Sequence, residues 1–124
     1  MSSTTNMTEL AQRYIDAWNE SDADARRNLV NQLYTPDARY TDPLVDAEGP
    51  DQIAATIAGV RQQFEGLVFS LAGRVDDHHE VARFQWHLGA PGADEPLVIG
   101  FDVAVARDGR LRRVYGFLDK VPAA

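Results

Sequence analysis

The hydrophobic pattern of the chain changes its period near Gly66, and this change limits the folds that the chain can adopt. Before Gly66, apolar residues recur at helical spacing in three segments, and Ile53, Ile57, Val60 and Phe64 form one such stripe. After Gly66, apolar and polar residues alternate with a period of two, which is typical of strands. Three helices followed by long antiparallel strands predict an α+β protein, and 124 residues suit one domain spanning residues 1–124.

The ends of the three helical segments can be placed from capping residues and breaks. We expect the first helix to begin at a Thr8 cap and to end at about Asn19. The second should run from about Asp24 to Tyr34, with Arg26 on its solvated face. The third should begin near Pro50, because proline suits the first turn of a helix.

Turn-forming residues divide the rest of the chain into strands and loops. A first strand is expected at Ala38–Pro43, followed by a loop over residues 46–50. A turn is expected at Asp76–Asp77 and a loop at residues 89–96. Asp108–Gly109 is a strong hairpin signal between the last two strands, near residues 97–107 and 111–119.

Asp42 lies at the end of the first expected strand, directly before Pro43. Proline lacks an N–H group and favours an extended conformation in the residue before it, so the strand should stop there. A strand-end carboxylate beside an apolar interior can act as a general base. Aspartate also commonly does no more than shape a turn, and these residues alone leave both interpretations open.

Asp102 is the polar exception in an apolar strand. It shares its face with small residues such as Gly100 and Ala104, which is typical of a cavity lining. A charge there is costly without partners, so Asp102 should be paired, hydrogen-bonded or protonated. A salt bridge to Arg83 or Arg112 is the alternative to a place at a pocket.

Composition excludes several classes of function. A formal net charge of −7 argues against nucleic-acid binding, because phosphate contacts need clustered cations. No apolar run approaches membrane-spanning length, and no secretory signal is visible. The absence of cysteine excludes disulfides and thiolate chemistry and fits a cytoplasmic protein. His78 and His79 lack further ligands nearby in the expected turn, so we expect no metal site.

Asp42–Pro43 after the first strand, the Asp108–Gly109 hairpin and the C-terminal Gly116-Phe117-Leu118 together carry a family resemblance. The chain resembles the superfamily that contains nuclear transport factor 2, the SnoaL-type polyketide cyclases and ketosteroid isomerase. The resemblance extends from about residue 10 to residue 119 and is closest to small bacterial SnoaL-like proteins. It implies a cystatin-like, conical α+β barrel, in which a strongly curved antiparallel sheet wraps three N-terminal helices around a pocket.

The resemblance to ketosteroid isomerase also implies roles for three residues. Tyr14 matches that family's oxyanion tyrosine, Asp42 its general base and Asp102 its protonated aspartic acid. The chain departs from the isomerases at Ile57, where they carry a further tyrosine that supports the oxyanion tyrosine.

On this interpretation the chain moves a proton on a steroid-like or polyketide-like ketone, as an isomerase or a cyclase, without a metal or organic cofactor. The ligand would be held by apolar side chains from the first helix and the sheet: Trp18, Phe84, Trp86, Val114 and Leu118. One alternative is an epoxide-type hydrolase, which needs an inward-facing arginine such as Arg83 or Arg112.

The other alternative is a non-catalytic module for ligand binding or dimerisation. The outer face of the sheet, with Val81, Gln85 and His87, is expected to support a homodimer, as is common in this superfamily.

Overall fold

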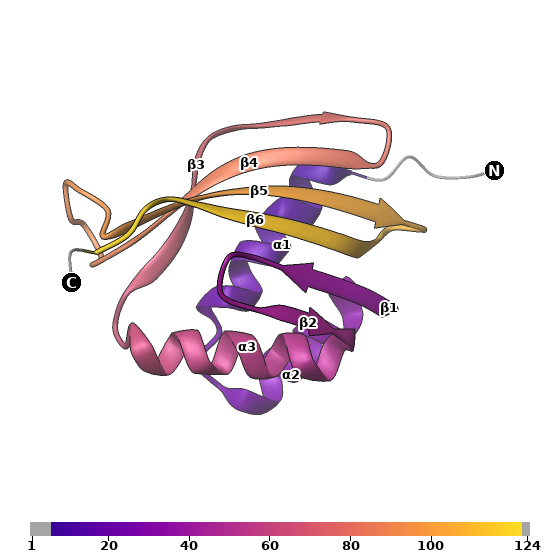
Figure 1. Ribbon diagram of the computed structural model, residues 1–124, viewed down its shortest axis with the longest axis horizontal. Coiled ribbons are helices and arrows are strands. Elements are labelled where there is room, and N and C mark those ends of the chain that lie inside the picture. Colours follow the sequence, from indigo (N-terminus) through magenta and orange to yellow (C-terminus); the bar gives the residue numbers. More distant parts are fainter. Residues whose placement is uncertain (1–5, 123–124) are drawn as a thin grey trace.

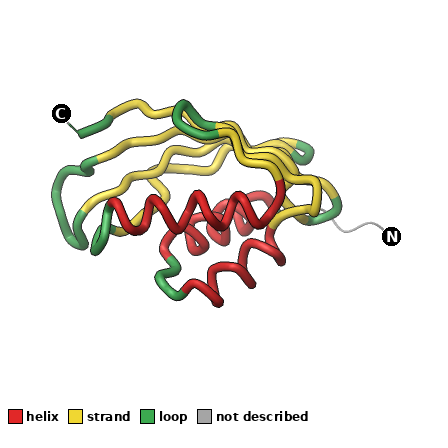
Figure 2. Tube along the Cα trace, turned by 60° about the horizontal axis from the view of Figure 1, so that its bottom comes forward, coloured by secondary structure: helices red, strands yellow, loops and turns green. Residues whose placement is uncertain are grey.

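In the computed structural model, which describes residues 6–122, three helices lie against one face of a curved sheet (Figure 1, Figure 2). The helices are α1 (Met7–Asn19), α2 (Ala23–Leu33) and α3 (Gly49–Gln63). The strands are β1 (Tyr34–Thr41), β2 (Asp46–Glu48), β3 (Val68–His78), β4 (Val81–Gly89), β5 (Val98–Arg107) and β6 (Arg110–Lys120). The predicted α+β class is confirmed, with the helices at the start of the chain and most strands after them.

The sheet is mixed, which corrects the expectation of a purely antiparallel one. Its strand order is β2-β1-β6-β5-β4-β3, and β1 runs parallel to β6 while the other neighbours are antiparallel. Parallel neighbours need a long crossover connection, which α3 and the strands β3 to β5 provide here. Strands β2 and β3 are the two edges of the described sheet, so it curves without closing.

The helix starts follow capping chemistry, with one correction. Asn6, not Thr8, caps α1, since its side-chain oxygen accepts a hydrogen bond of 3.0 Å from the Glu9 N–H. Thr8 already lies inside the helix. Asp22 caps α2 by accepting a hydrogen bond of 2.8 Å from the Ala25 N–H.

Arg26 is buried, although the sequence placed it on the solvated face of α2. Only 6% of the residue is exposed. Its guanidinium donates to the backbone carbonyls of Glu20 and Ser21 at 3.2 and 3.3 Å. The side chain therefore turns back to satisfy carbonyls of the link between α1 and α2 that have no helical partner.

Three boundaries among the first three strands in the chain, β1 to β3, also differ from expectation. Strand β1 already begins at Tyr34, and residues 46–50 form β2 and the first turn of α3 instead of a loop. Strand β3 continues through the expected turn at Asp76–Asp77 because Asp76 pairs with Arg83 of β4, by register and by a 3.0 Å ion pair. The turn lies at His79, which has a φ of 51°.

Side chains on the inner face of the sheet form the core with α1. On β4 the side chains of Ala82, Phe84, Trp86 and Leu88 alternate with those on the outer face, and all four are buried. At the end of α1 the Asn19 amide donates to the Phe69 carbonyl at 2.8 Å and accepts from its N–H at 2.7 Å. This pair of hydrogen bonds fixes α1 against β3. No helix within residues 6–122 is long and apolar enough to cross a membrane.

Candidate functional site

A cavity of about 340 Å³ lies between α1, the end of α3 and the inner face of the sheet. This volume is at the lower end of the range for pockets that hold drug-sized ligands. Its lining is mostly apolar and comprises Tyr14, Ile15, Trp18, Tyr40, Asp42, Leu44, Val60, Gln63, Phe64, Phe69, Trp86, Leu88, Val98, Leu118, Val121 and Pro122. Leu44 is 84% exposed, so it marks the mouth of the cavity.

Aromatic side chains form a continuous wall of the cavity. The ring of Trp18 lies 5.6 Å from that of Tyr40 and 5.5 Å from that of Phe69, centroid to centroid. Phe69 in turn lies 5.2 Å from Trp86. A Cβ atom on Gly100 would lie 2.0 Å from the Trp86 indole, so only glycine at this position lets the indole lie on β5.

Asp42 both shapes a turn and lines the cavity. Its Oδ1 accepts hydrogen bonds from the N–H groups of Leu44 and Val45 at 2.8 and 2.9 Å, and its own N–H donates to the Val45 carbonyl at 2.9 Å. The turn-forming interpretation of Asp42 is therefore confirmed. Because Asp42 also borders the cavity, the two interpretations do not exclude each other.

Tyr40 contacts Asp42 directly, and the sequence analysis did not single it out. Its hydroxyl donates to Asp42 Oδ2 at 2.6 Å. Burial, reinforced by the charges of Asp102 and Asp42, raises the pKa of Tyr40 well above its ordinary value, so the phenol remains a donor. The spacing could have indicated this contact, because residues two apart in an extended segment, such as Tyr40 and Asp42, point to the same face.

Tyr14 and Asp102 form a second tyrosine–carboxylate pair deeper in the protein. The Tyr14 hydroxyl donates to Asp102 Oδ2 at 2.6 Å. Burial, together with the charge of Asp42, raises the pKa of Asp102 to about 6, against the lowering effects of hydrogen bonds from the Tyr14 hydroxyl and the Trp86 indole. Tyr14 lines the cavity, whereas Asp102 is not among its lining residues and is only 1% exposed.

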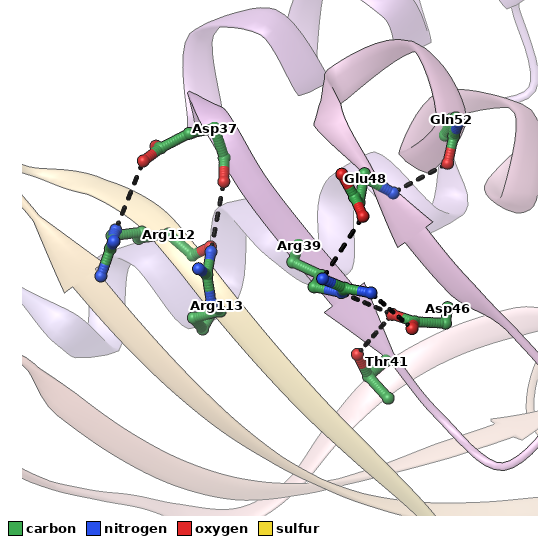
Figure 3. Close-up of polar contacts among 8 residues, drawn as sticks. All are labelled: Asp37, Arg39, Thr41, Asp46, Glu48, Gln52, Arg112 and Arg113. Carbon is green, nitrogen blue, oxygen red and sulfur yellow. Dashed lines mark hydrogen bonds and ion pairs between the residues drawn. The ribbon is translucent and has the colours of Figure 1, made fainter.

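The salt bridge considered for Asp102 does not form in the described part of the chain. Arg83 pairs with Asp76 at 3.0 Å, and Arg112 lies 3.6 Å from Asp37 (Figure 3). Both arginines are thus engaged elsewhere. Within residues 6–122, the side chains that line the cavity include no arginine.

The hairpin that carries Asp42 is braced from outside by an ion-pair network (Figure 3). Arg39 of β1 donates two hydrogen bonds of 2.8 Å to Asp46 of β2, and it also lies 3.3 Å from Glu48. Thr41 donates to Asp46 at 2.9 Å. The hydrogen bonds from Arg39 and Thr41 lower the pKa of Asp46 to about 2, so the brace persists at ordinary pH.

The residues expected to hold a ligand divide into two groups. Trp18, Trp86 and Leu118 line the cavity. Phe84 and Val114 do not: both are buried in the core, and Phe84 packs edge-on against Tyr14 at 5.6 Å.

Several lining residues were not expected at the ligand, among them Val60 and Phe64. Both belong to the apolar stripe of the third helix, and the stripe indicated burial without indicating a cavity.

No group of potential metal ligands converges within residues 6–122, and His78 and His79 contact each other edge to face.

Comparison with protein families adds to this description. The SnoaL-like domain family matches residues 11–114. No functionally curated protein matches the chain significantly.

Solved structures of similar proteins carry related assignments. A provisionally assigned isomerase of the SnoaL-like family from Agrobacterium tumefaciens strain C58 is 43% identical, with a TM-score of 0.85, covering 90% of this chain and 96% of its own. A provisionally assigned SnoaL-like polyketide cyclase from Jannaschia sp. CCS1 is 21% identical, with a TM-score of 0.71 and coverages of 90% and 84%. A provisionally assigned ketosteroid isomerase from Kribbella flavida DSM 17836 is 20% identical, with a TM-score of 0.68 and coverages of 94% and 79%.

Proposed function

Because the chain belongs to the SnoaL-like family, we propose that it is a proton-transfer enzyme, an isomerase or cyclase that enolises an apolar cyclic ketone in the cavity. The observation that carries this proposal is the presence of a carboxylate, Asp42, and a buried phenol, Tyr14, in the lining of one apolar cavity. These are the groups that enolisation requires, a base for the carbon-bound proton and a donor for the oxygen that becomes negative.

Asp42 is the base in this proposal. It takes the proton from the carbon beside the carbonyl and becomes a carboxylic acid, while the C–H electron pair forms the enolate. An isomerase then returns the same proton to a different carbon, which shifts the double bond. In a cyclase the enolate carbon instead bonds to a second carbonyl carbon of the substrate, and the oxygen of that carbonyl receives the proton.

Tyr14 is the donor to the enolate oxygen, and Asp102 acts through it. With Asp102 ionised, the Tyr14 hydroxyl donates to the carboxylate at 2.6 Å. With Asp102 protonated, the carboxylic acid can donate to the Tyr14 oxygen, and the Tyr14 proton is then free to point into the cavity. The pKa of Asp102, raised to about 6 chiefly by burial, makes this protonated form accessible near neutral pH.

The lining of the cavity favours an apolar ligand. Trp18, Trp86 and Leu118 would contact its rings, and Phe84 and Val114 support that wall from the core. The epoxide-type hydrolase is less well supported, because it needs an arginine at the carboxylates and the described lining contains none.

The proposal is tested with β,γ-unsaturated cyclic ketones, whose conjugated products absorb in the ultraviolet. A single-ring ketone and a steroid are supplied in parallel, because the cavity is near the small end of the ligand-pocket range. We expect the wild type to accelerate conjugation and Asp42→Asn to lose about 100-fold or more of the rate. Asparagine keeps the Oδ1 acceptor for the turn, so the variant should fold. Equal rates in the two proteins would leave a non-catalytic ligand-binding module as the better account.

A further inference from the structure

We propose that Oδ2 of Asp42 is the atom that accepts the substrate proton and that Tyr40 is the positioning residue that aims it. This inference rests on the proposed function and assigns a role to Tyr40. The two carboxylate oxygens of Asp42 have different hydrogen-bond environments.

The hydrogen bonds at Asp42 leave one position free. A carboxylate offers about four lone-pair positions, two on each oxygen. The N–H groups of Leu44 and Val45 occupy both positions of Oδ1. Tyr40 occupies one position of Oδ2. The remaining lone pair, on Oδ2, is the one that can receive a proton from a ligand in the cavity.

Tyr40 is held firmly enough to set the direction of that lone pair. Its backbone pairs with Ala47 of β2 on one side and with Val114 of β6 on the other. Its ring packs against Trp18, and only 4% of the residue is exposed. The 2.6 Å distance to Oδ2 is typical of a charge-assisted hydrogen bond between a hydroxyl and a carboxylate.

Gly116 of β6 provides the space in which this arrangement fits. A Cβ atom there would lie 3.0 Å from Asp102 Oδ1, 3.3 Å from Asp42 Cβ and 3.5 Å from the Tyr40 hydroxyl. Gly116 is also the register partner of Asp102. A side chain at residue 116 would therefore crowd the Asp102 carboxylate and the Asp42 Cβ atom, and it would touch the Tyr40 hydroxyl at an ordinary van der Waals distance.

The first test does not depend on activity. Proton NMR of the wild type should show downfield hydroxyl signals for short tyrosine–carboxylate hydrogen bonds. Tyr40→Phe and Asp42→Asn should each abolish the same signal and leave the one that Tyr14→Phe abolishes. The control Tyr115→Phe removes a hydroxyl from an exposed residue of the sheet and should change neither. A Tyr40 signal that is missing, or that survives Asp42→Asn, overturns the inference whatever the activity.

The second test separates positioning from packing. Tyr40→Phe keeps the ring in the cavity wall, so KM should stay within about twofold, while kcat should fall about ten- to 100-fold because the base is misdirected. Tyr115→Phe should keep the wild-type kcat. An unchanged kcat in Tyr40→Phe, with an active wild type, overturns the positioning role alone. An inactive wild type contradicts the proposed function, and the NMR signals then decide the Tyr40–Asp42 contact.

A glycine pair gives an independent check. Gly116→Ala places a methyl group against the carboxylates, and we expect it to shift the Tyr40 hydroxyl signal and to lower kcat about tenfold or more. Gly59→Ala is the matched control, because no atom outside its chain neighbours and its own helix backbone lies within 4 Å of its Cβ position. If Gly116→Ala is folded and keeps both the signal and kcat, the steric part of the inference is wrong.

Discussion

Replacing Asp102 with asparagine should make the protein more stable at neutral pH, by an amount that grows with pH. Asparagine has nearly the same size and can still accept the hydrogen bond from Tyr14, but it cannot ionise. Asp102 is 1% exposed, and burial raises its pKa from an ordinary value of 3.8 to about 6. The wild type must therefore place a charge in an unfavourable environment when the pH exceeds about 6, and the variant need not.

The sign follows from proton binding. Between the unfolded and folded pKa values the folded state binds more protons at Asp102 than the unfolded state, so the free energy of unfolding falls as the pH rises. The contribution of this group is fully present below about pH 4 and is lost as the pH rises through about 6. A shift of about two units corresponds to about 3 kcal/mol, and about half of that change falls above pH 5.

The assay is urea denaturation of the wild type and Asp102→Asn at a series of pH values from about 5 to about 8. All other carboxylates titrate in both proteins, so the difference between the two free energies of unfolding reports the titration of Asp102, including its coupling to the charge of Asp42. We expect this difference to move in favour of the variant by about 1 to 2 kcal/mol over that range. A difference that is constant with pH, or that moves toward the wild type, would refute the assignment of a raised pKa to Asp102.

Tyr34, Gly100, Asp102 and the outer face of the sheet can each be tested by a separate substitution. Tyr34→Phe should leave the free energy of unfolding unchanged or raise it by up to about 1 kcal/mol, because the Tyr34 hydroxyl is buried without a hydrogen-bond partner in the described residues. A loss of more than about 1 kcal/mol in thermal denaturation would contradict this, because it would show that the hydroxyl has a partner. Gly100→Ala should lower the free energy of unfolding by about 1 to 3 kcal/mol, because the added Cβ atom collides with the Trp86 indole in the cavity wall. The variant should also bind 2-naphthol, a fluorescent aromatic probe for the cavity, more weakly than the wild type, and equal binding in a fluorescence titration would contradict this. The isomerisation rate at a fixed substrate concentration should fall as the pH rises through about 6, because Asp102 then loses its proton. Asp102→Asn should remove this decrease, and the same decrease in the variant would show that another group causes it. We also propose a homodimer through the outer face of the sheet, where Phe117 is 56% exposed. Phe117→Asp should then sediment as a monomer. A wild type that is monomeric at all protein concentrations would exclude the dimer.

The sequence predicted the features that depend on local pattern. The change of period near Gly66 is enough to predict three helices followed by strands, and the Asp42–Pro43 pair is enough to end β1 before a turn. The inward direction of Trp86 follows from strict alternation along β4. The parallel pairing of β1 with β6 is different, because it joins segments far apart in the chain and no local pattern encodes it.

The errors have a common physical cause, which is that tertiary contacts decide where individual side chains lie. The charge of Arg26 predicts a solvent-facing side chain, but the backbone carbonyls of Glu20 and Ser21 accept its hydrogen bonds and hold it inside the protein. Tyr40 was overlooked because its role depends on the direction of its hydroxyl toward Asp42. The position of Phe84 on the inner face of β4 predicts contact with a ligand, but Tyr14 packs against its ring and lines the cavity in its place.

The most direct test of the central claim is the exchange of ketone α-hydrogens for deuterium, followed by proton NMR in heavy water. Exchange reports removal of the proton itself, whether the natural reaction is isomerisation or cyclisation. We predict that the wild type accelerates exchange of a small cyclic ketone over buffer and that Asp42→Asn loses about 100-fold or more of that acceleration. Equal exchange in the wild type and Asp42→Asn would contradict the assignment of Asp42 as the base.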